Sequence, residues 1–151
     1  MRAGAVAAAL ALAALLAGCA GTSATPSPSG EPTPSDATTP LTAVEAGDCY
    51  DEADADSVTV VDCTTAHGYE VFASLLLADG DYVQSTISAD AEARCRTAFG
   101  TFIGLEFDAS ALGLRYVAPS ERTWEQGDRE VLCVAFDPAG PTGGSLAGAA
   151  R

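Results

Sequence analysis

Five cysteines in a chain of 151 residues limit how it can fold more than any other feature does. Cys19 ends an N-terminal segment with the features of an export signal, and the other four lie within residues 41–137. An even number of cysteines in a small exported domain predicts disulfides. A zinc site made of four cysteines is the rival interpretation, but such sites use closely spaced pairs. We therefore expect two disulfides, formed by Cys49, Cys63, Cys95 and Cys133.

The N-terminus predicts export and a lipid anchor. Residues 1–17, MRAGAVAAALALAALLA, contain one Arg followed by an apolar run of the length found in secretory signals. This run is shorter than the roughly 20 apolar residues that cross a bilayer. It ends in LAGC, residues 16–19, which resembles the bacterial lipobox, where the chain is cut before the cysteine and the new N-terminus is acylated. We expect residues 1–18 to be a lipoprotein signal peptide and acylated Cys19 to hold the mature protein on the outer face of the cytoplasmic membrane. An ordinary secretory signal that contains a cysteine is the alternative.

The charge of the chain argues against one class of partner. The formal net charge is −14, there is no Lys, and cleavage before Cys19 would also remove Arg2. A strongly acidic surface without basic clusters repels nucleic acid and anionic lipid headgroups. We expect no nucleic-acid partner and a membrane contact made through the lipid anchor.

Composition divides the mature chain into three parts. Residues 19–40 contain the lipidated Cys and a Thr/Ser/Pro-rich stretch with five prolines, which predicts a disordered linker. Residues 41–137 are long enough for one small domain. The Gly/Ala-rich tail, residues 138–151, is expected to fray, although Ser145 and Leu146 could add a short strand edge.

Periodicity predicts the strands of the domain. The segments SVTVVDC (57–63) and YEVFASLLL (69–77) are rich in β-branched, aromatic and aliphatic residues, and the short polar turn TTAHG separates them. We expect them to form a β-hairpin. Further strands are expected at residues 112–117 and 130–136, and the second of these is apolar on both faces, as in a central strand.

Between these strands, TISADAEARCRTAFGTFIG (86–104) has a helical period. Ser85 or Ser88 is expected to cap the helix, Gly104 to end it, and one face to be formed by Ile87, Ala91, Cys95, Ala98 and Phe102. With a first strand near Cys49, the order is three strands, one helix and two strands. This order predicts an α+β fold, a small disulfide-stapled domain with one main helix packed on a largely antiparallel sheet of about four to five strands.

Four cysteines allow three pairings. Cys63 ends a strand that can return beside the segment ending at Cys49, which favours a bridge between these two. Cys95 lies on the buried face of the helix and must meet a core strand, and Cys133 lies in the most apolar strand. We therefore expect the bridges Cys49–Cys63 and Cys95–Cys133.

The only histidine lies in CTTAHGYE, residues 63–70. Catalysis by His67 would need a nucleophile, and the nearby thiols are expected to be oxidised. A metal site would need further ligands that the spacing does not impose, so we expect no catalytic residue, no metal and no cofactor. We expect the imidazole to bond to local backbone or to Glu70. Two further candidates for a structural or binding role are Trp124, expected to be a lid on the core, and Arg129.

Two other patterns do not meet the requirements of known sites. The acidic stretch GDCYDEADADS (47–57) lacks the ligand spacing of a calcium loop and predicts a solvated turn. The segment GGSLAG (143–148) approaches a nucleophile elbow, but Ala147 replaces the second Gly and the flanking sequence does not fit a hydrolase.

Four segments taken in order, AGDCYD, VVDCTTAHGYEVFA, CRTAFGTFIG and YVAPSERTWEQGDREVLCVAFDPAGPTGGSL, resemble the septum-formation family domain of actinobacterial envelope proteins over residues 44–146. In the family pattern C..PH..E, which corresponds to residues 63–70, Ala66 stands in place of proline. The resemblance implies a membrane-tethered extracytoplasmic domain with paired cysteines, and it implies no established activity and no catalytic residues.

These observations favour a binding or scaffolding module of the cell envelope, linked to septum formation, with envelope or division proteins as partners. The alternative is a small envelope enzyme that uses His67 with Glu70 or a nearby Asp. The oligomeric state stays open.

Overall fold

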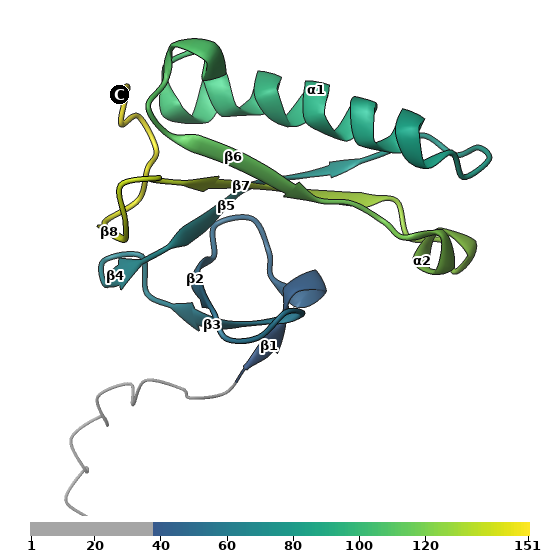
Figure 1. Ribbon diagram of the computed structural model, residues 1–151, viewed down its shortest axis with the longest axis horizontal. Helices are drawn as coiled ribbons and strands as arrows, with labels where there is room; N and C mark the ends of the chain where they lie inside the picture. The colour runs from purple at the N-terminus through teal and green to yellow at the C-terminus, as the bar shows by residue number, and fades with distance from the viewer. Residues whose placement is uncertain (1–37) are drawn as a thin grey trace, which may run out of the picture. The chain divides into compact units, whose positions relative to one another are not determined.

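The computed structural model describes residues 38–151 (Figure 1). The signal peptide, Cys19 and nearly all of the expected linker lie outside the described residues. The two α-helices are α1 (Gln84–Ile103) and α2 (Glu121–Glu125), and short 3-10 turns are formed by Leu41–Ala43 and Phe107–Ala109. The strands are β1 (Thr39–Pro40), β2 (Cys49–Glu52), β3 (Ser57–Val61), β4 (Ala66–His67), β5 (Tyr69–Leu76), β6 (Gly113–Val117), β7 (Glu130–Phe136) and β8 (Thr142–Gly143).

The main sheet has the strand order β1-β3-β2-β5-β7-β6, and each neighbouring pair is antiparallel. Figure 1 shows α1 lying along one side of this sheet, where it contacts β5, β6 and β7. A second, two-stranded sheet joins β4 to β8. The structure therefore confirms the expected α+β fold with one main helix on a largely antiparallel sheet, and the two-residue β1 brings the main sheet to six strands.

The expected hairpin between residues 57–63 and 69–77 is wrong. Within the described chain, β2 lies between β3 and β5 and pairs with both. The acidic stretch that we expected to be a solvated turn supplies β2, because Cys49 and Tyr50 are fully buried despite the charged residues that follow them. The turn itself is short, and in it Ala53 and Asp54 donate to the carbonyl of Ser57.

Helix α1 ends as expected and begins differently. Gly104 closes it with a left-handed φ of 81° and donates to the Gly100 carbonyl. The N-cap is Val83, with no side-chain cap, so the expected cap by Ser85 or Ser88 is wrong. The buried stripe keeps a spacing of four residues throughout and comprises Ile87, Ala91, Cys95, Phe99 and Ile103.

This stripe corrects the expected buried face, because Ala98 and Phe102 are only half-buried. A constant spacing of four turns the stripe by about 40° at each step, since a turn of helix takes 3.6 residues. The stripe therefore winds around α1. Because the sheet beneath the helix is itself twisted, a winding stripe keeps facing the sheet along the length of α1.

Both expected disulfides are present. Cys49–Cys63 has a Cα–Cα distance of 5.1 Å and ties β2 to the chain beyond β3, while Cys95–Cys133 has a Cα–Cα distance of 5.5 Å and ties α1 to β7. Strand β7 is buried on both faces, as expected for a central strand. Its residue Cys133 packs in the cluster beneath α1, and Val134 packs in the cluster on the opposite face of the sheet.

The C-terminal segment, for which we expected fraying, is packed against the domain. Leu146 is buried, Gly148 donates to the Phe102 carbonyl, and Ala150 donates to the Ile103 carbonyl. These bonds satisfy carbonyls at the end of α1 that have no partner within the helix. The packed structure therefore continues past Asp137, and the pairing of β1 with β3 shows that it also begins before Leu41.

Candidate functional site

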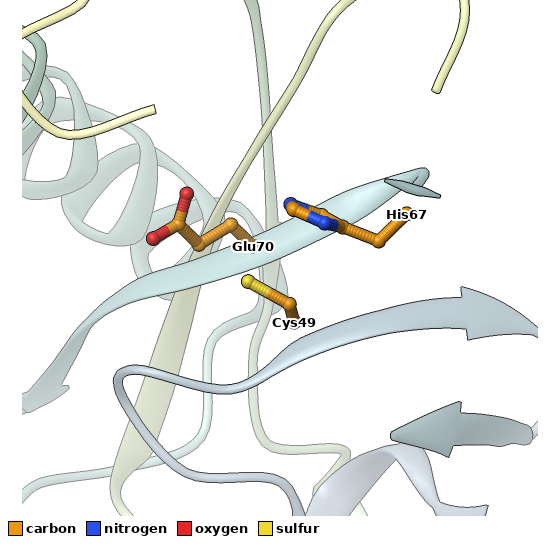
Figure 2. A group of neighbouring side chains, drawn as sticks. All are labelled: Cys49, His67 and Glu70. Carbon is orange, nitrogen blue, oxygen red and sulfur yellow. The ribbon is translucent and has the colours of Figure 1, made fainter. Parts of the chain in front are cut away.

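Three side chains that could carry chemistry meet at one corner of the domain. Cys49 comes from β2, His67 from β4 and Glu70 from β5, and one potential ligand atom of each lies within 4.8 Å of the others (Figure 2). All three are buried, with exposed fractions of 0%, 1% and 4%. The pairing of Cys49 with Glu70 in neighbouring strands brings these two side chains together.

His67 lies in β4 and not in a hairpin turn as we expected. Its Nδ1 is 2.8 Å from the carbonyl oxygen of Thr65, which is the local backbone bond expected from the sequence. Because a carbonyl can only accept, Nδ1 carries the hydrogen of this bond. The other ring nitrogen, Nε2, is buried and has no hydrogen-bond partner among residues 38–151.

Glu70 holds the C-terminal segment instead of bonding to His67. Its Oε1 accepts from the Ser145 hydroxyl at 2.6 Å, and its Oε2 accepts from the Leu146 N–H at 2.7 Å. Bonds to a buried carboxylate are stronger than bonds between neutral groups. Ser145, the serine of the GGSLAG segment, therefore helps to satisfy a buried carboxyl group. The short edge expected at Ser145 and Leu146 is wrong, because the strand of this segment is β8, Thr142–Gly143, which pairs with β4.

Cys49 is bonded to Cys63, so its sulfur is neither a thiolate nucleophile nor a metal ligand in this state. Because Cys49 is oxidised and His67 and Glu70 are buried, the cluster has a structural role at this corner of the domain. The corner fixes β2, β4 and β5 to each other and to the end of the chain.

Trp124 and Arg129 form a separate contact, since α2 and β4 lie at opposite ends of the sheet (Figure 1). Trp124 packs in the cluster beneath α1, and its indole N–H donates to the Gly80 carbonyl at 3.0 Å. The Arg129 guanidinium lies 3.7 Å from the centre of the indole ring and donates to Asp79. These residues hold α2 against the loop that follows β5, and this placement agrees with the expected core lid.

The sequence did not predict a half-buried arginine, Arg115, on the other face of the sheet. Arg115 lies 3.6 Å from the centre of the Tyr69 ring and donates to the Tyr50 hydroxyl at 2.8 Å and to Glu52 at 2.6 Å. Burial raises the pKa of Tyr50. Burial also works against the charge of Arg115, but its bonds to Tyr50 and Glu52 outweigh this and raise its pKa. The available signal was a single charged residue inside the apolar strand LGLRYV.

Among the described residues, no helix combines the length and apolar character needed to cross a membrane. Comparison with curated proteins and with solved structures gave no match. A family model described as septum formation matches residues 46–148, which is more than half of the chain and includes all four bridged cysteines, His67 and Glu70. Septum formation is a process of the cell envelope. On this match, and on the paired cysteines and the α+β fold, the chain belongs to the septum formation family.

Proposed function

We propose that this protein is a lipid-anchored extracytoplasmic module that binds or scaffolds envelope or division proteins. The proposal rests mainly on one observation: Cys49, His67 and Glu70, whose residue types could form a catalytic site, are all buried. His67 is bonded to backbone, Glu70 to the C-terminal segment, and Cys49 to Cys63. A catalytic group must reach a substrate, whereas these three side chains form bonds that hold segments of the domain together. The alternative, an enzyme that uses His67 with Glu70 or a nearby Asp, would need these two side chains to reach a substrate, and both are buried.

The location is supported by two independent features. The two disulfides suit an oxidising compartment, and LAGC at residues 16–19 supplies the acylation signal. Metabolic labelling with a fatty acid tests the anchor. We expect the wild-type chain to be labelled and recovered with membranes, and Cys19→Ser to lose both the label and the membrane fraction. Equal labelling of the two chains would contradict the anchor.

A surface able to contact a partner lies beside α2. An open hollow of about 640 Å³ is bordered by Val117, Ser120, Arg122, Gln126, Asp128 and Leu132, a mixture of polar and apolar side chains. Arg122 is exposed and is the only cation that borders the hollow, which Asp128 and Glu130 also border, so it offers a partner one site for a bond to a carboxylate.

Cross-linking in intact cells, followed by isolation of the protein, tests the binding role. We expect defined cross-linked partners with the wild type and a loss of at least half of them with Arg122→Glu. Arg94→Glu is the control, because it reverses a cation on α1 that does not border the hollow; it also removes the bond from Arg94 to the Leu76 carbonyl, so circular dichroism checks its fold, and it should keep the partners. A wild-type chain that cross-links to nothing, or an effect of Arg94→Glu equal to that of Arg122→Glu, would contradict a binding surface beside α2.

A further inference from the structure

The His67 ring is set in the way that proteins set a metal-binding histidine. A metal-binding His usually donates one ring N–H to a carbonyl or carboxylate, which fixes the ring and leaves the other nitrogen free to bind. Here Nδ1 donates to the Thr65 carbonyl, and Nε2 is buried without a partner within residues 38–151. A buried nitrogen lone pair without a donor costs free energy, so its retention needs an explanation.

Sulfur and oxygen donors lie next to this ring. Figure 2 shows the Cys49 sulfur and the Glu70 carboxylate beside His67, and one donor atom of each residue lies within 4.8 Å of the others. The sulfur of Cys63 is bonded to that of Cys49 and therefore lies at the edge of this group, which consists of Cys49, His67 and Glu70. Each Glu70 oxygen accepts one hydrogen bond, which leaves each with a further lone pair.

We propose that this corner is a redox-gated zinc site, in which reduction of the Cys49–Cys63 bridge allows Cys49, Cys63, His67 and Glu70 to bind one Zn²⁺. Two thiolates, one imidazole and one carboxylate are zinc ligands of the usual types and number. Zinc bonds of about 2.0–2.3 Å place tetrahedral ligand atoms about 3.3–3.8 Å apart, so the group must contract by about 1 Å. Loss of the sulfur–sulfur bond frees the Cys49 sulfur to turn toward His67 and Glu70, and it frees the half-buried Cys63 to approach them as the fourth ligand.

A dithiol can act as the reductant of the Cys49–Cys63 bridge. The dithiol gives two electrons and two protons to the bridge and becomes a disulfide, while Cys49 and Cys63 become thiols. Zn²⁺ then displaces one proton from each thiol. In the reverse direction a disulfide accepts the two electrons from the thiolates and two protons from water and becomes a dithiol, the bridge forms again, and Zn²⁺ leaves because both sulfur ligands are lost. Zinc in the reduced chain would thus hold β2, β4 and β5 together until the bridge forms.

The second bridge provides an internal control. Cys95 and Cys133 are fully buried among Leu77, Ile87, Ala91, Trp124 and Val131. Within residues 38–151 these two sulfurs belong to no group of three potential metal ligands, so we expect this pair to bind no zinc when reduced.

The test uses the full-length chain with Cys19→Ser, so that the four domain cysteines are the only thiols. Co²⁺ serves as the spectroscopic probe and Zn²⁺ as its competitor, before and after treatment with a dithiol that is then removed. We expect no cobalt spectrum from the oxidised chain. The reduced chain should bind one Co²⁺ with thiolate charge-transfer bands and the visible bands of tetrahedral cobalt, which zinc abolishes. Removing the second bridge with Cys95→Ala and Cys133→Ala should leave this binding intact.

His67→Gln should weaken metal binding by more than about 100-fold, the upper end of the loss seen when an outer partner of a ligand is removed. Circular dichroism follows folding in each sample, and refolding of a reduced, unfolded chain by zinc also supports the site. The proposal is overturned if the reduced chain binds no metal, whether folded or unfolded. It is also overturned if His67→Gln binds as tightly as the parent, or if binding disappears only with Cys95→Ala and Cys133→Ala.

Discussion

The role of His67 as a structural residue in the oxidised protein is directly measurable. We expect His67→Ala to lower the free energy of unfolding by about 2–4 kcal/mol, since it loses one hydrogen bond worth about 1 kcal/mol and leaves a cavity where a buried ring packed. Thermal melts of both proteins measure the difference. Thr65→Ala is the matched control, because it removes an exposed side chain and keeps the carbonyl that accepts from Nδ1.

Thr65→Ala should melt within about 0.5 kcal/mol of the wild type, as surface substitutions usually do. Coincident melts for His67→Ala and the wild type would mean that the ring contributes nothing to the fold. The zinc site of the reduced chain would then be the remaining reason for a buried imidazole at this position.

Among the elements, the pairing of β6 with β7 depends on a close approach at Gly113. Gly113 stands opposite Phe136, and a Cβ built on it would overlap the Phe136 ring. Gly113→Ala must displace this ring, which costs about 1–3 kcal/mol, whereas Ala gains only about 0.5–1 kcal/mol over Gly in a strand. We therefore expect a net loss of stability, measured by chemical denaturation.

Gly143→Ala is the control for this strand glycine. Its added Cβ would meet nothing closer than 3.8 Å, so we expect a neutral or slightly stabilising effect. Equal effects of the two substitutions would show that the Phe136 ring moves aside without cost.

The two bridges differ in how much chain they close. Cys49–Cys63 spans 14 residues and Cys95–Cys133 spans 38. In the loop-entropy account these bridges contribute about 3 and about 4 kcal/mol. We expect the double substitution of Cys95 and Cys133 by Ala to lower the melting temperature more than that of Cys49 and Cys63. The reverse order would mean that the corner around His67 stabilises the fold more than the link between α1 and the sheet.

At the scale of the whole molecule, the sequence correctly predicted the features that depend on neighbouring residues. The helix end at Gly104, the doubly buried β7 and the inward direction of Cys95 follow from the φ preference of Gly and from the spacing of apolar residues. Both disulfide pairings also followed from which segments are buried.

Contacts between distant segments were not predictable in the same way. Strand β2 separates β3 from β5 because Cys49 and Tyr50 are buried, and the charges beside them hid this from a reading of composition. Glu70 finds its partners 75 and 76 residues away, at Ser145 and Leu146, where the sequence suggested a short strand edge but not which residue it would contact. The candidate site therefore depends on pairings that no short window of sequence contains.

The bonds that Asp137 makes to the C-terminal segment cause the free energy of unfolding to depend on pH. Asp137 accepts from the Ala139 N–H and from Arg151 at 2.7 Å, and these bonds lower the pKa of its carboxyl. A carboxyl with a lowered folded pKa stabilises the fold above its ordinary pKa of about 4, and the contribution is lost as the pH falls through the folded value.

We therefore expect Asp137→Asn to be less stable than the wild type at pH 7 and the difference to shrink as the pH falls below about 4, because the Asp137 carboxyl then becomes neutral as well. Denaturant titrations from pH 7 to pH 2 measure this difference. Asp81→Asn, at an exposed carboxyl without a hydrogen bond in the described chain, should follow the wild type at every pH. A difference that stays constant with pH would mean that Asp137 acts through its shape and not through its charge. In that case the ion pair with Arg151 would not be what holds the end of the chain to the domain.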